Sequence, residues 1–387
     1  MTEKLYDKDA HLKEFSATVL SCEKSEESYA VTLNKTAFFP EGGGQESDCG
    51  SIGEAQVLDV QIVANEIIHY TDRPLDVGAE YACSLDWDRR FRNMQNHSGE
   101  HIISGLVHKL YGLNNVGFHL GAEMTVDFDG VLSREQLSEV ERVANKAVWE
   151  NVPIKAYYPQ ENELKSLNYR SKLELTENVR LVEIEGYDLC ACCAPHVKKT
   201  GEIGLIKILD FFKNKGGVRI FIKCGTDALD DYNGKYFNVF KISNLLSVKK
   251  NEAAEAVDRL NDENRELKFE ILNLKKRLIA EKAKNFAPDT DKTAAFEENL
   301  DIKELQLFAD ALYKKCKGIR GVFSGEDGNY SFAICGEETV LDLFFKSFKE
   351  RFSVRGGGRN GMVQGTITAE KKEIERFFYN TRDGSMC

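Results

Sequence analysis

The stretch HSGEH, residues 97–101, places two histidines four positions apart, with a glutamate directly before the second. On an α-helix, His97 and His101 would lie one turn apart on the same face, so both imidazoles can reach one metal ion. Histidine pairs with this spacing also occur on ordinary helix surfaces. The pair therefore indicates a candidate metal site that needs further ligands from elsewhere in the chain.

Such ligands occur in LCACCAPHV, residues 189–197, where Cys192 and His196 are again four residues apart. Two histidines from one segment and a cysteine and a histidine from another form a chemically complete zinc set. The alternative for the cysteine run, which also contains Cys190 and Cys193, is a group of buried structural thiols. Taken together, the two segments predict one Zn²⁺ per chain, held by His97, His101, Cys192 and His196.

A peptidase is the other interpretation of the first segment, because H-x-x-E-H is the inverted zincin pattern with Glu100 as general base. That site takes a carboxylate as its third ligand and has no need of a Cys-x-x-x-His segment. Gly99, inside the expected helix, indicates close approach of a substrate or a strand. The second segment therefore favours the four-ligand site over a peptidase.

A glycine-rich stretch, KTAFFPEGGGQESDCG at residues 35–50, supplies a third feature. Three consecutive glycines, Gly42 to Gly44, predict a loop whose backbone comes close to another group. The alternative is a structural hairpin loop without a direct role in binding.

The elements that must position these motifs are mixed helices and strands. Strand patterns occupy residues 16–24, 28–35, 55–71 and 79–87, and they resume at 153–158, 179–184 and 218–223. Residues 88–111 carry apolar positions at helical spacing and stop at Gly112. A second helix is expected from Ser133 to Trp149, with Ser133 as its cap and Gln136 three residues later.

Residues 243–285 have a different character. A series of residues follows steps of alternately three and four positions, and all of them are apolar except Asn264. The series is Val257, Leu260, Asn264, Leu267, Ile271, Leu274 and Leu278. This is the a/d seam of a coiled coil, in which an asparagine at an a position fixes register and strand number. A homodimer through this segment is expected. The alternative is a long helix packed on its own chain.

The remainder predicts a linker and a small α/β domain. FAPDTDKTAA, residues 286–295, is a linker by composition. Beyond it, helices are expected at 305–316 and 340–352, strands at 320–325 and 330–336, and a glycine-rich turn follows.

Composition sets the broad class. The chain has 387 residues, is 42% hydrophobic and 30% charged, and carries a net charge of −11. These values predict an ordinary globular protein and argue against broad coating of nucleic acid, so no DNA partner is expected. No apolar run is long enough for a membrane span, and the charged N-terminus lacks a signal core. A cytoplasmic location is expected, with most of the ten cysteines reduced and buried.

The motifs, in this order and spacing, resemble the editing domain of alanyl-tRNA synthetases and its free-standing AlaX-type relatives. KTAFFPEGGGQESDCG, the helix with HSGEH and CCAPHVKKTGEIGLIKI carry the resemblance over about residues 15–225. The family's H-x-x-x-H and C-x-x-x-H zinc motifs fall on His97, His101, Cys192 and His196. GGGRNGMVQG, residues 356–365, resembles the glycine-rich turn of the C-terminal RNA-binding domain shared with DHH-type phosphoesterases.

The resemblance implies an α+β fold with the layout of the long AlaX form. We expect a two-part editing region, with a small β-barrel-like part at residues 1–90 and an α/β zinc-binding part at 91–240. A helical coiled-coil arm follows at 241–287, and a small α/β RNA-binding domain at 288–387.

The resemblance also implies a function, the hydrolysis of tRNA for alanine that is mischarged with serine or glycine. His97, His101, Cys192 and Glu100 are the candidate catalytic residues. Four protein ligands would complete the zinc tetrahedron, so zinc either activates a water after one ligand loosens or only positions the 3′ adenosine.

Substrate contacts are expected from the glycine loop and its flanks. The resemblance implies that Gly42, Gly43, Gly44 and Gln45 line the aminoacyl pocket. Glu41 stands where some archaeal relatives have a threonine, and His119 stands near where the synthetase tends to have a glutamine. Both are candidate substrate contacts.

For tRNA, a local basic excess at residues 198–223, which includes Lys198 and Lys199, and a C-terminal glycine turn are candidates. The turn contains Arg355, Gly356, Gly357, Gly358 and Arg359. Two rival functions are a tRNA-binding protein with a degenerate editing site and an editing enzyme for a different aminoacyl-tRNA.

Overall fold

The computed structural model describes residues 2–25, 27–121, 123–171, 179–286 and 291–380. It is a mixed α+β structure, which confirms the expected class. The chain divides into two compact units, Met1–Lys241 and Ile242–Cys387. Among the described residues, no helix combines the length and the apolar character that crossing a membrane requires.

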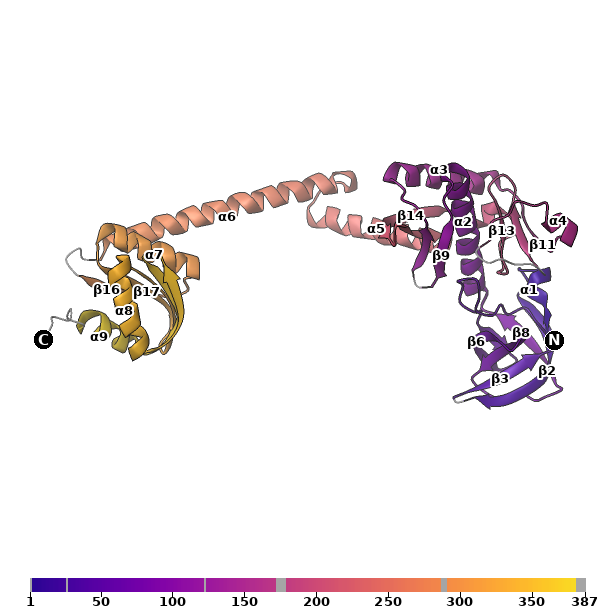
Figure 1. Ribbon diagram of the computed structural model, residues 1–387, viewed down its shortest axis with the longest axis horizontal. Coiled ribbons are helices and arrows are strands. Elements are labelled where there is room, and N and C mark those ends of the chain that lie inside the picture. Colours follow the sequence, from indigo (N-terminus) through magenta and orange to yellow (C-terminus); the bar gives the residue numbers. More distant parts are fainter. Residues whose placement is uncertain (1, 26, 122, 172–178, 287–290, 381–387) are drawn as a thin grey trace. The chain divides into compact units, whose positions relative to one another are not determined.

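Unit 1 begins with a six-stranded closed barrel (Figure 1). The barrel order is β2-β3-β7-β6-β5-β8, and its core includes Val31, Leu33 and Val60. The strands are β2 (Glu14–Ser25), β3 (Ser28–Leu33), β5 (Gly50–Ile52), β6 (Ala55–Val63), β7 (Glu66–Thr71) and β8 (Glu80–Leu85). A parallel pair, β1 (Glu3–Lys4) and β4 (Lys35–Thr36), and a short helix α1 (Leu5–Lys8) accompany it.

Helix α2 (Trp87–Tyr111) is the central element of unit 1. Asp86 caps it by accepting a hydrogen bond from the Arg89 amide, and Gly112 ends it in the left-handed region at φ 69°. Gly99 lets the helix approach the next sheet, because a Cβ there would lie 2.2 Å from Sγ of Cys224. The strand approach expected from Gly99 is therefore confirmed, and the strand is β15.

That sheet has four antiparallel strands in the order β14-β15-β10-β9. They are β9 (Asn115–Leu120), β10 (Met124–Phe128), β14 (Ile206–Asn214) and β15 (Gly217–Cys224). Helix α3 (Arg134–Glu150) has the expected capping box between Ser133 and Gln136. Apolar side chains of α2, α3 and this sheet form one core.

A three-stranded sheet completes the zinc-motif region of unit 1. Its order is β11-β12-β13, with β11 (Ile154–Tyr157), β12 (Leu181–Ile184) and β13 (Asp188–Ala191). The helical turn α4 (Glu161–Leu164) lies between β11 and β12 in the sequence, and η1 (Thr200–Ile203) follows β13. Helix α5 (Thr226–Leu245) follows β15.

Unit 2 contains α6 (Ala253–Lys284) and a five-stranded sheet, which has helices on both faces. The sheet order is β16-β17-β18-β20-β19, from β16 (Lys292–Glu297), β17 (Ile319–Glu326), β18 (Asn329–Cys335), β19 (Ser353–Arg359) and β20 (Met362–Thr368). Helix α7 (Ile302–Lys315) and the C-terminal end of α6, with Ile279 and Ala283, cover one face. Helices α8 (Glu338–Arg351) and α9 (Lys371–Asn380) cover the other with a phenylalanine-rich core.

The expected helical arm consists of the end of α5, a 3-10 turn, η2 (Lys250–Glu252), and α6, and the apolar seam lies within α6. Two expectations need correction. Residues 292–295 of the expected linker belong to β16, where they pair with β17, while 287–290 lie outside the described residues. All nine described cysteines are free thiols, but only Cys83, Cys224, Cys316 and Cys335 are buried.

Candidate metal centre and its cavity

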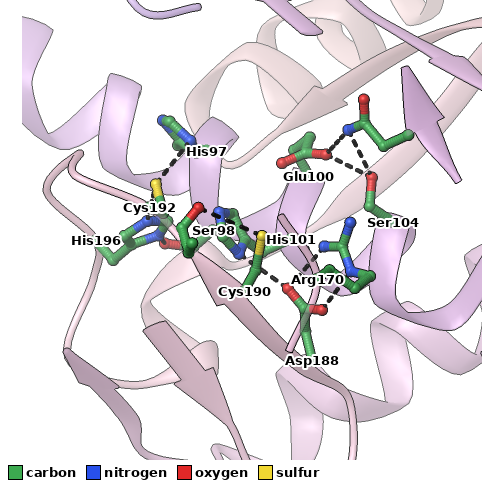
Figure 2. Close-up of polar contacts among 12 residues, drawn as sticks. His97, Ser98, Glu100, His101, Ser104, Arg170, Asp188, Cys190, Cys192 and His196 are labelled. Atoms are coloured by element: carbon green, nitrogen blue, oxygen red, sulfur yellow. Dashed lines mark hydrogen bonds and ion pairs between the residues drawn. The ribbon is translucent and has the colours of Figure 1, made fainter. Parts of the chain in front are cut away.

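The two sequence motifs meet in unit 1. Helix α2 supplies His97 and His101, and the segment after β13 supplies Cys192 and His196 (Figure 2). One ligand atom from each of the four residues lies within 4.8 Å of all the others. Sγ of Cys192 is 3.5 Å from Nε2 of His97 and 3.4 Å from Nε2 of His196. The three histidines are buried and Cys192 is partly exposed, so the group can hold a metal ion at the edge of a cavity.

Each histidine of this cluster is oriented through its other ring nitrogen. Nδ1 of His97 lies 2.9 Å from Oε1 of Gln45, and Nδ1 of His101 lies 2.9 Å from Oδ2 of Asp188. Nδ1 of His196 lies 3.1 Å from Oγ of Ser98. These contacts leave Nε2 of each ring for the centre of the cluster, an arrangement that metal-binding histidines commonly have.

The anchor of His101 depends on a close approach between α2 and the turn before β13. A Cβ at Gly105 would lie 2.3 Å from the carbonyl oxygen of Tyr187 and 2.7 Å from Cβ of Asp188. Only glycine therefore allows Asp188 to reach His101. Arg170 fixes the carboxylate from the other side, with Nε 2.7 Å from Oδ1 and Nη2 2.8 Å from Oδ2.

The loop that carries Cys192 and His196 is held by a buried arginine. Nη1 of Arg180 donates to the carbonyl oxygens of Cys192 and Ala194, at 3.0 and 2.9 Å. These bonds fix the backbone between the two ligands.

The electrostatics of the cluster attract positive charge. Burial opposes ionisation of the Cys192 thiol, but the neighbouring His97 and His196 rings lower its pKa well below the ordinary value. Burial also opposes protonation of His101, yet hydrogen bonds with Asp188 and Cys192 raise its pKa well above the usual value. Burial lowers the pKa of His196 to about 3. These shifts favour Cys192 as the thiolate and His196 as the neutral imidazole, the states in which zinc binds these groups, whereas His101 must release a proton when a metal binds.

A second grouping, His101, Asp188 and Cys190, also has ligand atoms within 4.8 Å of one another. It shares His101 with the first cluster, and both carboxylate oxygens of Asp188 bond Arg170. We therefore assign it to the support of the first cluster.

The glycine loop lies against β9. Gly44 has a φ of +83°, and a Cβ there would lie 2.5 Å from the carbonyl oxygen of Phe118. The Leu120 amide donates to the carbonyl oxygen of Gly44 over 2.7 Å, and the Phe118 ring lies 4.9 Å from the His97 ring. The expectation that the glycines permit close backbone approach is met at Gly44.

A buried ion pair ties the base of this loop to α2. Both Arg90 and Asp48 are fully buried and bonded to each other, and Oδ2 of Asp48 accepts from the Phe39 amide at 2.6 Å. Arg90 also donates to the carbonyl oxygens of Ala10 and Ala37. The loop between residues 39 and 48 is thereby fixed at both ends.

A cavity of about 1040 Å³ opens beside the cluster. Its wall near the cluster includes Gly43, His97, Glu100, His101, Phe118 and Cys192. Tyr158, Tyr169 and Arg170 line it further away. This volume is at the upper end of the range for small-molecule sites, so it can take a group larger than an amino acid.

Not every predicted site residue reaches this cavity. The exposed Glu41 accepts a hydrogen bond from Gln61 on β6, at 2.7 Å. His119 is exposed, and alternation along β9 directs it away from the buried Phe118, toward Asp127 on β10. Neither side chain belongs to the cavity wall, so their predicted substrate contacts are not supported.

The basic segment at 198–223 is largely neutralised. Four of its cations form ion pairs, namely Lys198 with Asp9, Lys207 with Glu141, Arg219 with Asp127 and Lys223 with Asp231. Lys199 is exposed before η1, and in unit 2 Arg355 and Arg359 are exposed on the edge strand β19. The local charge is therefore weaker than the sequence count indicates.

Sequence reasoning did not single out Ser98, Ser104, Asn115, Arg170 and Asp188. Their side chains hold the candidate ligands or the cavity-lining groups in place. Their positions in the sequence have no regular spacing from those groups that would have pointed to this role. The aspartate and the cysteines in GYDLCACC are the one signal that could have found Asp188, since metal-binding histidines often pair with a carboxylate.

Known proteins that are similar to this chain provide independent evidence about its function. Residues 179–221 match the family model described as threonyl and alanyl tRNA synthetase second additional domain. The alanyl-tRNA editing protein AlaX-L of Pyrococcus horikoshii is 29% identical, and the match covers 97% of this chain and 96% of that protein. The alanyl-tRNA editing protein Aarsd1-A of Xenopus laevis is 28% identical, with 95% of each chain covered.

A longer relative is an alanine–tRNA ligase of Ignicoccus hospitalis, which is 34% identical over 72% of this chain. The match covers 32% of that protein, so this chain spans about a third of its length.

Proposed function

We propose that this chain, a relative of alanyl-tRNA editing proteins along nearly its whole length, is an aminoacyl-tRNA deacylase that uses zinc. Its substrates would be tRNA for alanine charged with serine, and also with glycine. The observation that carries the proposal is a buried cluster of three histidines and one cysteine at the edge of a cavity of about 1040 Å³. No other group of metal donors among the described residues is independent of this cluster.

The need for such an enzyme follows from binding energies. A pocket that binds alanine cannot strongly reject an isostere that only adds a hydroxyl group, and discrimination near a hundredfold is typical. A separate hydrolytic site removes the error.

The donor set fits zinc. His97, His101, Cys192 and His196 would hold one ion, with nitrogen and sulfur ligands that zinc prefers. A bound zinc ion can polarise an ester carbonyl or lower the pKa of a water molecule to about 7. The protein contributes the orientation of the ligands, through Gln45, Asp188 and Ser98, and a cavity wall that excludes bulk water from one side of the ester.

Gly43 is the best-supported contact for the aminoacyl group because it is part of the cavity wall, and Gln45, which is buried beside His97 and is not part of that wall, is a second candidate. Oε1 of Gln45 accepts from His97, which leaves the amide nitrogen Nε2 buried and without a hydrogen-bond partner. A buried unpaired donor costs about 1–3 kcal/mol, and a carbonyl oxygen of the ligand would supply the acceptor. Gly43 lies on the cavity wall, where its backbone can approach the substrate. Gly42 and Gly44 shape the loop.

For the body of the tRNA, we propose contacts in unit 2. Strand β19 is an edge strand that pairs only with β20, and Arg355 and Arg359 flank Gly356, Gly357 and Gly358 on it. Exposed peptide amides and two arginines can bind phosphate oxygens. Lys198 and Lys199 remain a secondary candidate, and binding should weaken as salt rises.

We also propose that α6 mediates a homodimer. Its a/d side chains from Val257 to Leu278 are 45–57% exposed, apart from the polar Asn264, so the rest of unit 2 does not cover the apolar seam. A stripe of this size on a monomer would favour aggregation. A second copy covers it, and paired Asn264 side chains can hydrogen-bond only in register.

Charges beside the seam favour parallel helices. Glu263 occupies a g position and Lys268 the following e position, and both are exposed. In a parallel pair, g of one helix faces e of the other, so Glu263 meets Lys268 of the second copy. In an antiparallel pair, g faces g and e faces e, so like charges meet. Glu270 and Lys275 repeat the pattern, although Lys275 also contacts Glu304 within the chain.

The decisive test is deacylation of Ser-, Gly- and Ala-charged tRNA for alanine, with and without a chelator. We expect hydrolysis of the serine ester, and hydrolysis of the glycine ester at a similar or lower rate. The alanine ester should not be hydrolysed, and the chelator should abolish the activity. Binding of tRNA without hydrolysis would indicate a degenerate editing site. Hydrolysis of only another aminoacyl-tRNA would indicate a different editing role. The cytoplasmic location stays a prediction.

A further inference from the structure

Glu100 is a buried carboxylate on the cavity wall. It lies on α2 directly before the ligand His101, is 4% exposed, and lines the cavity together with His97 and His101. Removing an ionised carboxylate from water is costly unless hydrogen bonds and a cation compensate for the lost hydration. The groups around Glu100 therefore indicate what it binds.

One oxygen of this carboxylate is fully engaged by neutral donors. Oε1 accepts from Oγ of Ser104 and from Nδ2 of Asn115, each at 2.5 Å. The orientation of the Asn115 amide is fixed in turn, because its Oδ1 accepts from the Gly117 amide at 3.0 Å. Figure 2 shows the other oxygen of Glu100 directed away from Ser104.

No cation of the described residues bonds this carboxylate directly, and Arg170 interacts with it only through space. Within the described residues, no lysine or arginine forms an ion pair with Glu100, and the nearby Arg170 bonds both oxygens of Asp188. A buried carboxylate that lines a ligand cavity, with one oxygen held by neutral donors and no cation bonded to it, is suited to a positively charged ligand group.

We propose that Glu100 binds the α-ammonium group of the aminoacyl ester, an inference that rests on the function proposed above. An ester of serine or glycine with a free amine carries this charge over much of the neutral range. An N-acylated ester does not, and its extra acyl group needs space beside the carboxylate. The site therefore selects aminoacyl-tRNA and spares tRNA that carries a blocked amine, such as a peptidyl group.

This role differs from that of a general base in its dependence on the substrate. A base acts on water, so its loss slows hydrolysis of every ester by a similar factor. An ammonium-binding group matters only for substrates that carry the charge.

The test compares seryl-tRNA with N-acetyl-seryl-tRNA. Removing one partner of a buried charge pair costs about 2–5 kcal/mol, so we expect wild-type kcat/KM to favour the free amine by roughly 100-fold. Glu100→Gln should lower kcat/KM for seryl-tRNA toward that of the acetylated substrate and leave the latter nearly unchanged. Glu100→Asp should retain part of the preference. Glu185→Gln, a carboxylate at the exposed rim of the same cavity, should keep the full preference.

Equal slowing of both substrates in Glu100→Gln, or no preference in the wild type, would overturn the inference. A binding measurement separates it from the proposed function. The seryl amide of 3′-amino-3′-deoxyadenosine and its N-acetyl form cannot be hydrolysed as esters, so their affinities for the zinc-loaded full chain report recognition alone. Absence of ester hydrolysis with tighter binding of the free amine would reject the deacylase and retain the role of Glu100. Equal affinities would reject the role of Glu100.

Discussion

Nδ1 of His101 and Oδ2 of Asp188 are 2.9 Å apart, although 87 residues separate them in the chain. The carboxylate fixes the ring so that Nε2 faces the other ligands, and Arg170 holds the carboxylate. The geometry of the proposed ligands therefore depends on residues that would not bind the metal themselves.

Asp188→Asn should weaken zinc binding by about 10–100-fold, because the amide orients His101 less firmly and does not stabilise charge on its ring. Competition against a chromogenic chelator measures this affinity. Asp127→Asn is the matched control, since Asp127 pairs with Arg219 on the opposite side of the sheet from the ligands. Equal zinc affinity in Asp188→Asn and the wild type would contradict the anchoring role.

Gly105→Ala should also weaken zinc binding, although Gly105 contacts no metal. The added Cβ would lie 2.3 Å from a backbone oxygen, so the turn that carries Asp188 must move. Gly234→Ala is the control. Gly234 is an exposed position in α5 with nothing within 4 Å of an added Cβ. It should raise the free energy of unfolding by about 0.5–1 kcal/mol and leave zinc affinity unchanged. The prediction fails if both variants bind zinc as the wild type does.

His69 should make the barrel less stable in mild acid. The ring is fully buried between Thr36 and the Val31 carbonyl, and burial lowers its pKa to about 4 from the ordinary 6.5. Between these values the unfolded chain binds a proton that the folded chain does not, so stability is present above pH 6.5 and is lost as pH falls toward 4.

The predicted loss between pH 7.5 and pH 5 is about 2 kcal/mol of unfolding free energy. Urea titrations of the wild type and His69→Gln at both values of pH give the change in unfolding free energy with pH for each protein. The difference between the two changes isolates His69, because all other groups titrate in both proteins. His108→Gln, at an exposed position, should behave as the wild type. An identical pH dependence in wild type and His69→Gln would exclude the predicted effect.

Leu267→Lys combined with Ile271→Lys should convert a dimer into a monomer, because charges would enter the apolar seam of α6. Sedimentation velocity at about 10 µM, a concentration at which a stable coiled coil persists, measures the change. Phe269→Lys removes an apolar side chain that is 67% exposed but lies off the seam, so the dimer should remain. Wild-type protein that sediments as a monomer would disprove the dimer.

A charge exchange tests the parallel orientation separately. Glu263→Arg should weaken the dimer by placing like charges opposite Lys268 of the second copy, and adding Lys268→Glu should restore it. Failure of the second change to restore the dimer would favour antiparallel helices.

Features that depend on local backbone geometry could be predicted from the spacing of residues along the chain. The four-residue spacing within HSGEH predicted two ligands on one face of a helix, since the helical repeat is 3.6 residues. Ser133 and Gln136 predicted a helix start, and the a/d seam predicted a long amphipathic helix, for the same kind of reason. The predicted linker was wrong at residues 292–295, which form part of a strand paired with β17. Amino-acid composition alone does not show such pairing.

Contacts between side chains far apart in the sequence could be identified only in the folded chain. His119 was a reasonable candidate by position, but alternation along β9 directs it away from the cavity. Gln45 reaches His97, Asp188 reaches His101 and Asn115 reaches Glu100 through the packing of separate elements on α2. Contacts across such separations follow from sheet order and from glycines that permit close approach, neither of which leaves a fixed spacing in the sequence.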